Sequence, residues 1–588
     1  MQSGKNNKTS QSRRDILKPL LLDEVKNNIM HKINLLNIFS GRMRMKNIAD
    51  TVIYGDFYTV DEKNPKAQAA AIADGKFIYV GDTAGAKAFV GEGTKEEHYE
   101  GGMILPGFVD GHAHGNLGGS KMLLMCPLND CRTLDAIRDK LKKFIAEHPE
   151  MDKIQGMGWN DADFGTNGPT AAMIDDLTDK PIAMIDYGHH SFWLNSAAMK
   201  LKNINKDTPD ISDGVIVRDA DGNPTGCFRE GTSIYFNDLL YHFTVEEYKK
   251  ALLAYQDVFL SIGVTMTFDP MVNYDYGSEN VMEAYHQLDV EGKLKLRVHG
   301  GYQVFVDKNP VADVENGVKC REKFKGDRFA VDNIKILLDG VVESATAYLN
   351  EPYSNSTDGY RGLLRFDPKT LAATVKKSNE LDIIMHIHTI GDGAIAEALN
   401  AFEKAGTTPA QRAALTHLQI VNPADIDRMA KLGVVAVTNP YWFVKEPNYH
   451  TKLSVPYLGE ERAENQYPLK SFFDKGVVVT QATDYPVTAD LRPINGIQTA
   501  VIRQVSGEPE TLLNPSERVT VEQMIKAATL NGAYQFKCED TLGSITVGKK
   551  ADMVVLDLDI TACAPEHIND AKVMRTMIEG EWVYISEK

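Results

Sequence analysis

The strongest constraint on the fold is a series of eight short apolar runs that alternate with helical stretches between residues 103 and 487. This alternation is typical of βα units, in which crossover helices join parallel strands. Eight is also the number of strands that closes a (β/α)8 barrel. We therefore predict an α/β fold with a (β/α)8 TIM barrel over residues 103–540. The eight candidate strands are residues 103–114, 263–270, 294–302, 333–340, 382–392, 413–421, 433–442 and 476–487.

The segments outside these runs suggest three further parts. Residues 45–102 and 541–588 both show short strands separated by turns, and we expect them to pair into one small β-sandwich domain built from both chain ends. The gap after the first candidate strand is too long for one crossover helix, which predicts an insertion at about 125–241 that covers the barrel mouth. Residues 1–44 are expected to form a flexible extension, because the apolar run after their paired arginines is too short for an export signal.

Charge and cysteine content bear on partners and compartment. A formal net charge of −17 argues against a nucleic-acid partner, since such binding needs basic surface. The six cysteines are scattered, and none forms a Cys-x-x-Cys pair, so we expect reduced thiols and a cytoplasmic protein. The chain contains no apolar run of roughly 18 residues, which predicts that it does not enter a membrane. A homodimer is an expectation from the general frequency of dimers alone.

Polar side chains gather where several candidate strands end. His112 and His114 close the first strand, and both imidazoles point to one side because side chains alternate along a strand. Such a pair suits a metal ion, although an isolated pair of this kind could equally be solvated loop residues. Residues at strand ends of a barrel carry its chemistry, so these positions are candidates for one site. The later candidates are Lys335, Asp339, His386, His388, His417 and Asp484.

Six short motifs in this order and spacing make a specific pattern, although each is weak alone. They are GFVDGHAH, IKILLDGVVES, HTIGDGAI, THLQI, ATDYPV and LGSITVGKKADMVVLD. In these motifs the chain resembles the amidohydrolase superfamily of metal-dependent hydrolases. Within it, the chain is similar to the amidohydrolase 3 branch, which includes YtcJ-like proteins and N-substituted formamide deformylase. The resemblance covers nearly all of residues 45–588.

The resemblance implies a centre of one or two divalent metal ions, with zinc favoured and iron or manganese as alternatives. The implied ligands are His112, His114 and Asp484 for one ion and His388 and His417 for a second. Lys335 would be N-carboxylated and bridge the two ions, because burial lowers the pKa of a lysine and the neutral amine can add carbon dioxide. The alternatives are a mononuclear site with Lys335 unmodified, or a Lys335 that pairs with Asp339.

The same resemblance implies the reaction. A divalent metal ion lowers the pKa of water, so that hydroxide can attack a carbonyl group. Asp484 would accept the proton of the water as general base and later pass it to the leaving amine as general acid. We therefore expect hydrolysis of a C–N bond in a small-molecule amide, N-acyl compound or cyclic amide. The alternative is a catalytically inactive ligand-binding or regulatory member of the same fold, which would be marked by a missing metal ligand.

Five residues are candidates for substrate binding. Trp159, His190 and Trp193 lie in insertion segments that resemble family segments near the substrate, although aromatic residues in an insertion more often serve packing. His386 shares a strand face with His388, which favours a supporting position behind the ligands. The fifth candidate is Asp339, just beyond the strand that carries Lys335.

Overall fold

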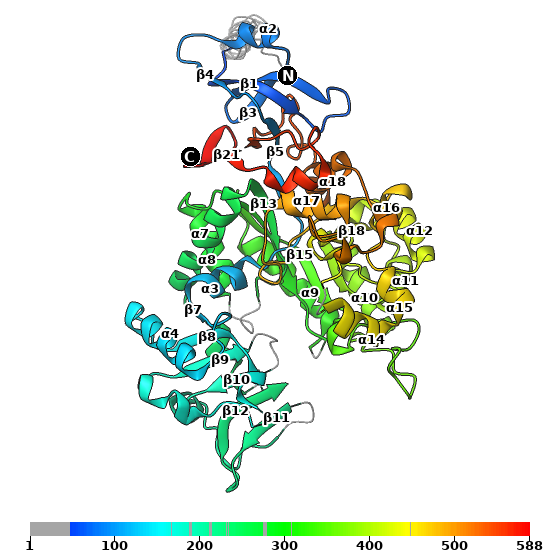
Figure 1. The fold of residues 1–588 in the computed structure, drawn as a ribbon. Coiled ribbons are helices and arrows are strands. Elements are labelled where there is room, and N and C mark those ends of the chain that lie inside the picture. The colour runs from blue at the N-terminus through cyan, green and yellow to red at the C-terminus, as the bar shows by residue number, and fades with distance from the viewer. Residues whose placement is uncertain are drawn as a thin grey trace, which may run out of the picture.

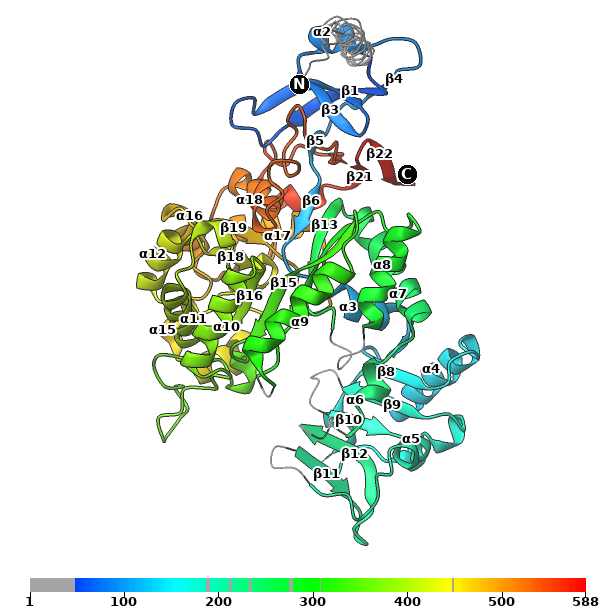
Figure 2. The ribbon, with the colours of Figure 1, turned by 180° about the vertical axis from the view of Figure 1, so that it is seen from behind.

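The computed structural model describes residues 48–587, apart from residues 166, 187–190, 211–213, 231, 233–234, 274–278, 307 and 447–448. Three parts follow one another along the molecule in Figures 1 and 2: a terminal sheet, a central barrel and an insertion lobe. The chain passes from the terminal sheet into the barrel, leaves it for the lobe, and ends in the terminal sheet again. Within the described residues, no helix combines the length and the apolar character that a membrane span needs.

The barrel is a sheet of eight parallel strands, which confirms the predicted (β/α)8 fold. Each of the eight predicted runs overlaps one barrel strand. Between the first and last strands, the backbone N–H of Gly111 donates to the carbonyl oxygen of Gln481 over 2.9 Å. In order around the barrel the strands are β6 (Phe108–Asp110), β13 (Val264–Asp269), β14 (Arg297–Gln303), β15 (Phe329–Leu337), β16 (Ile384–Thr389), β17 (Ala414–His417), β18 (Val435–Thr438) and β19 (Val479–Gln481).

Helices cover the outside of the barrel, as Figure 2 shows for α9 (Pro310–Lys323) and α10 (Pro368–Glu380). Local sequence fixes where they begin. Thr244 and Glu247 form a reciprocal capping box at the start of α7 (Val245–Ser261), and Asp367 caps α10 with Pro368 at its first position. The other helices around the barrel are α8 (Asn280–Val290), α11 (Asp392–Ala405), α12 (Pro423–Leu432), α14 (Val455–Leu458), α15 (Glu460–Glu464), α16 (Leu469–Asp474), α17 (Pro493–Ile502), α18 (Val521–Ala527) and α19 (Leu530–Gln535).

Both ends of the chain build the terminal sheet, which is one hydrogen-bonded sheet of eight strands. Its halves meet where β5 pairs antiparallel with β20, from Met103 opposite Leu556 to Pro106 opposite Met553. Apolar side chains from both halves share one buried cluster, as Ile53 and Met577 do. The strands are β1 (Thr51–Tyr58), β2 (Lys66–Ala73), β3 (Lys76–Gly81), β4 (Lys95–His98), β5 (Met103–Pro106), β20 (Met553–Leu556), β21 (Val573–Ile578) and β22 (Glu581–Ile585).

The insertion lobe, residues 125–241, follows the first barrel strand and carries its own sheet of six strands. In both views it follows α3 (Gly115–Leu123), which contacts β7 of the lobe. That it covers the barrel mouth stays a prediction. Its elements are β7 (Met125–Pro127), α4 (Leu134–Glu147), β8 (Ile154–Trp159), β9 (Ile182–Asp186), β10 (Ser191–Leu194), α5 (Ser196–Leu201), β11 (Gly214–Arg218), β12 (Pro224–Glu230) and α6 (Asn237–Tyr241).

A buried ion cluster joins the terminal sheet to the barrel. Arg297, at the start of β14, donates to Asp552 just before β20 and to Glu579 over 2.8 Å. Glu579 also accepts from Arg328 over 3.0 Å and pairs with Lys550 over 2.6 Å. Burial raises the pKa of Glu579, but Lys550 and Arg297 outweigh burial and leave the pKa at about 2. The carboxylate therefore stays charged at neutral pH and can hold the two parts together.

We predict that Arg297→Met lowers the free energy of unfolding by about 3–5 kcal/mol, because the buried Asp552 loses its cation. Lys475→Met is the control, since it breaks an exposed pair with Asp427 and should cost at most about 1 kcal/mol. Urea unfolding followed by circular dichroism measures both. Equal decreases in the free energy of unfolding for the two variants would show that the buried ion cluster contributes no more to stability than an exposed ion pair.

Candidate metal centre

The candidate site forms where the first and last barrel strands end. The loop after β6 carries His112 and His114, and the loop after β19 carries Asp484. The two loops are hydrogen bonded to each other: the N–H of Asp484 donates to the carbonyl of His112, and the N–H of His114 donates to that of Tyr485, both over 2.7 Å. The backbone hydrogen bonds therefore hold the two histidines beside the aspartate without any contribution from their side chains.

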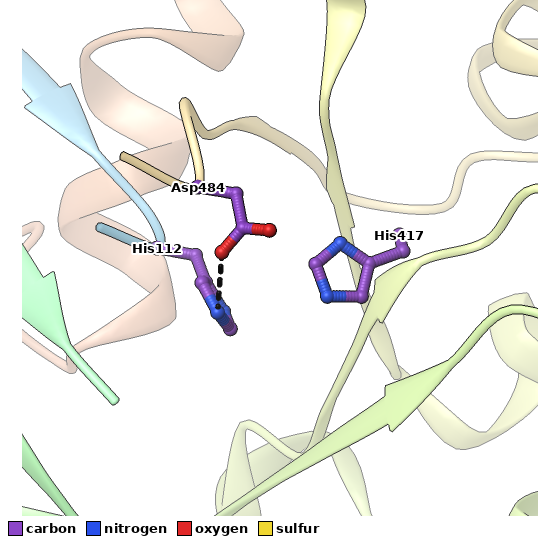
Figure 3. A group of neighbouring side chains, drawn as sticks. All are labelled: His112, His417 and Asp484. Atoms are coloured by element: carbon purple, nitrogen blue, oxygen red, sulfur yellow. Dashed lines mark ion pairs between the residues drawn. The ribbon is translucent and has the colours of Figure 1, made fainter. Parts of the chain in front are cut away.

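The side chains of these loops converge on one carboxylate oxygen. Oδ1 of Asp484 lies 3.3 Å from Nε2 of His112 and 3.2 Å from Nε2 of His114. Figure 3 shows His417 facing the same carboxylate from the opposite side, at the end of β17. One ligand atom from each of His112, His417 and Asp484 lies within 4.8 Å of the others. Strand ends that are far apart in the sequence thus meet at one point.

The predicted ligand His388 lies beside this group, with its ring centroid 4.7 Å from that of His417. Hydrogen bonds at Nδ1 orient both rings. Nδ1 of His388 donates to Oδ1 of Asp339 over 3.0 Å, and Nδ1 of His417 donates to Oδ1 of Asn439 over 2.9 Å. An imidazole that carries its hydrogen on Nδ1 keeps the lone pair of Nε2 for another partner, which is the arrangement found in metal sites.

Burial keeps three imidazoles of this site uncharged. It lowers the pKa of His388 and of His417 to about 3, and it lowers the pKa of His112 well below the usual histidine value, with Lys335 acting in the same direction. A neutral imidazole is the form that binds a metal ion.

The carboxylate of the site behaves in the opposite way. Burial raises the pKa of Asp484, but the close approach of His112 and His114 outweighs burial and brings the pKa well below the usual aspartate value. The group therefore holds one anion among neutral nitrogen donors.

Two atoms of the group are buried without a hydrogen-bond partner among the described residues: Nε2 of His112 and Oδ1 of Asp484. A buried polar atom without a partner costs about 1–3 kcal/mol, so such atoms call for an explanation. A divalent cation between a carboxylate and imidazole nitrogens would satisfy both atoms. The residues present therefore fit the metal ion that the resemblance implies.

Two residues of the site have a strained backbone. Asp484 and His417 have φ angles of +55° and +78°, in the left-handed region that non-glycine residues rarely adopt. Strain of this kind costs of order 1–3 kcal/mol and persists only where the surrounding structure enforces it. The fold therefore holds both side chains in place at a cost to stability.

Lys335 lies on β15, next to His386 in the sheet register, and its side chain is almost completely buried. It forms no ion pair or hydrogen bond with any described residue, and Asp339 accepts from His388 and from backbone N–H groups instead. Burial lowers the pKa of Lys335 to about 7, against a smaller opposing effect of Asp484. The alternative in which Lys335 pairs with Asp339 is therefore wrong.

Most of the chain matches one known protein family. A family model described as "Amidohydrolase family" (Amidohydro_3) matches residues 99–584. The chain belongs to the amidohydrolase family. This amidohydrolase is 29% identical to YtcJ of Bacillus subtilis over 90% of its own length and 98% of that protein. The resemblance predicted from the motifs is confirmed.

Two further similarities concern activity. The chain is 26% identical to the N-substituted formamide deformylase of Arthrobacter pascens, with 90% of this chain and 97% of the relative covered. The crystal structure of an uncharacterized metal-dependent hydrolase from Pyrococcus furiosus superposes with a TM-score of 0.72 at 25% identity, over 88% of this chain and 99% of the other. Family and relatives together support a hydrolase that acts on C–N bonds.

The predicted substrate-binding residues have different surroundings in the structure. Trp159 and Trp193 have no accessible surface, and their rings pack edge-to-face at 5.7 Å in the core of the insertion lobe. We therefore assign both to packing, which was the alternative. Asp339 and His386 are also buried, and both bond to histidines of the site instead of facing an open space. His190 lies outside the described residues.

Sequence reasoning missed two residues that hold the ligands. Asn439 follows β18 and orients His417. Asp110, at the end of β6, accepts the backbone N–H groups of His112 and of Thr483, both over 3.1 Å, and the hydroxyl of Thr483 over 2.6 Å. Asp110 could have been identified from the sequence, because it is a carboxylate that follows an apolar run and stands two residues before the histidine pair.

We predict that Asp110→Ala lowers the free energy of unfolding by at least about 2 kcal/mol, since it leaves the buried N–H groups of His112 and Thr483 unpaired. Asp110→Asn should cost less, because its amide oxygen can still accept from both groups. Thermal and urea unfolding compare the two variants. If alanine is tolerated as well as asparagine, the carboxylate does not fasten these loops.

Proposed function

We propose that this amidohydrolase is a metal-dependent enzyme that hydrolyses a C–N bond in a small-molecule amide, N-acyl compound or cyclic amide. The observation that carries the proposal is the buried carboxylate of Asp484, held against Nε2 of both His112 and His114 with ligand atoms left unpaired. An anion among neutral imidazoles at the C-terminal ends of barrel strands is a suitable setting for a divalent cation.

In this proposal the chain holds one or two divalent ions, with zinc favoured because imidazole and carboxylate ligands suit it and iron or manganese as alternatives. When bound, the metal lowers the pKa of a water molecule and polarises the carbonyl of the substrate. The first ion would be held by His112, His114 and Asp484, and the second by His388, His417 and the modified Lys335.

The side chains of the protein would transfer the proton and hold the histidines in place. One carboxylate oxygen of Asp484 faces the two histidines, and the other can accept a proton from the attacking water. The same oxygen can return this proton to the nitrogen of the leaving amine, so that no charged amide anion has to depart. Asp339 and Asn439 keep His388 and His417 oriented throughout.

Lys335 is proposed to act as a carbamate. A lysine buried without an anion partner is unfavourable as an ammonium ion, and its lowered pKa supplies the neutral amine that adds carbon dioxide. The addition forms an N–C bond and releases one proton, which converts a buried cation into an anionic oxygen ligand. This change would place a negative charge beside His112, His388 and His417.

We expect His112→Ala and Asp484→Asn each to lower turnover by at least about 100-fold while the fold is retained, since each removes a ligand or the proton acceptor. His567→Ala and Asp474→Asn are the matched controls on exposed side chains and should keep full activity. The assay is a panel of N-formyl, N-acyl, hydantoin-like and lactam compounds, with metal content measured in parallel. A stoichiometrically metal-loaded wild type that turns over none of them, or a variant that keeps its turnover, would contradict the proposal.

The carbamate is tested separately. Protein equilibrated with carbon-13 bicarbonate should give a carbamate NMR signal that is lost in Lys335→Met and kept when the exposed Lys431 is replaced by Met. The signal should weaken as the pH falls below about 7, because the protonated amine cannot add carbon dioxide. A signal that survives in Lys335→Met would assign the carbamate to another residue.

A further inference from the structure

A histidine pair crosses the interior of the barrel beneath the candidate metal centre. Nε2 of His386, on β16, lies 2.8 Å from Nδ1 of His112, although the residues are 274 positions apart. His386 has no accessible surface and His112 has 1%. This hydrogen bond differs from those of His388 and His417, whose partners are a carboxylate and an amide oxygen that can only accept.

The hydrogen bond to His112 is the sole polar contact of the His386 ring within the described part of the chain. Its Nδ1 atom is buried without a partner, and the ring of Phe268 lies with its centroid 4.7 Å away. An apolar side chain would avoid this unpaired atom, since a buried polar atom without a partner costs about 1–3 kcal/mol. The imidazole of His386 therefore has one evident use, which is its contact with His112.

Two neutral imidazoles can share such a bond in two ways. In one, His386 donates from Nε2 and His112 carries its own hydrogen on Nε2, which then points at Oδ1 of Asp484 over 3.3 Å. In the other, His112 donates from Nδ1 to His386, and the lone pair of its own Nε2 is free. Only the second arrangement lets His112 serve as a metal ligand through Nε2.

We propose that His386 is a positioning residue for His112: its Nε2 accepts the Nδ1 hydrogen and thereby holds the tautomer and ring orientation that the metal requires. This inference rests on the proposed function, because it assumes that the centre binds a metal ion. It replaces the expectation that His386 contacts the substrate, and it places the support of His112 on the strand across the barrel rather than on a neighbouring strand.

The test compares His386→Gln with His386→Met. The two side chains are close in size and shape, but only glutamine offers an oxygen near the position of the imidazole Nε2. Zinc and cobalt(II) affinities of the metal-stripped full-length protein are measured by competition with a chelating dye. We expect methionine to weaken metal binding by about 10–100-fold, the usual effect of losing a partner of a metal-bound histidine, and glutamine to remain near the wild type.

His299→Met provides a control for general disruption of the barrel. His299 is another barrel histidine, bonded to Asp332 over 2.6 Å and to none of the proposed ligands. It should lower the unfolding temperature without changing metal affinity. The absorption spectrum of the cobalt(II) protein gives a further readout, which should match the wild type in His386→Gln and change in His386→Met.

The possible failures can be told apart. A wild type that binds no stoichiometric metal would overturn the proposed function itself. Tight binding by the wild type with equally tight binding by His386→Met would overturn this inference and leave the proposed function standing. Equal weakening in the glutamine and methionine variants would also overturn it, because the role of His386 would then be packing and not hydrogen-bond acceptance.

Discussion

The site depends on how the barrel closes between its first and last strands. Asp110 binds backbone N–H groups on both sides of this junction, and Asp484 donates its own N–H to the carbonyl of His112. A carboxylate and an imidazole can share a cation only if both approach it to about 2 Å, so a small shift in either loop would separate them. Main-chain hydrogen bonds supply the required precision, and the positive φ angle of Asp484 shows that they do so against local strain.

The electrostatics of the site follow from burial in this closed sheet. Removal from water keeps His112, His388 and His417 neutral and lowers the pKa of Lys335 to about 7. Asp484 stays anionic because the close approach of His112 and His114 outweighs burial. In the same buried surroundings the histidines are therefore neutral and the aspartate is charged. These are the protonation states in which both kinds of side chain can bind a metal ion. The family relationship and the geometry both support the proposed metal centre.

The sequence predicted the parts of this arrangement that depend on local periodicity. Alternation along a strand places His112 and His114 on one side, and apolar runs located all eight barrel strands. Partners across the barrel could not be predicted in this way. The alternation of side chains along a strand predicted that His386 lies on the same strand face as His388. Its contact with His112 could not be predicted, because it depends on which strand lies opposite in the closed barrel. Asn439 and Asp110 act through neighbouring loops, which leave no periodic signal.

The insertion lobe illustrates a different limit. Trp159 and Trp193 stand in motifs that resemble substrate-facing segments, yet the lobe has its own sheet and needs its own core. Large aromatic side chains gain most from burial there, and the two rings pack against each other and against Phe164. Similarity to the family therefore identified these two residues in the sequence but did not predict the direction of their side chains. The side chains are buried because the lobe needs an apolar core.

The pairing of the chain ends has a consequence for how the protein is made. Strand β5 pairs with β20, and Asp110 bonds to Thr483, which lies 373 positions further along the chain, so neither the terminal sheet nor the barrel junction can be completed until nearly the whole polypeptide has left the ribosome. The emerging chain must carry an open sheet edge for most of its synthesis. His112 is among the first parts of the centre to be translated, and it acquires its aspartate only when the last barrel strand arrives.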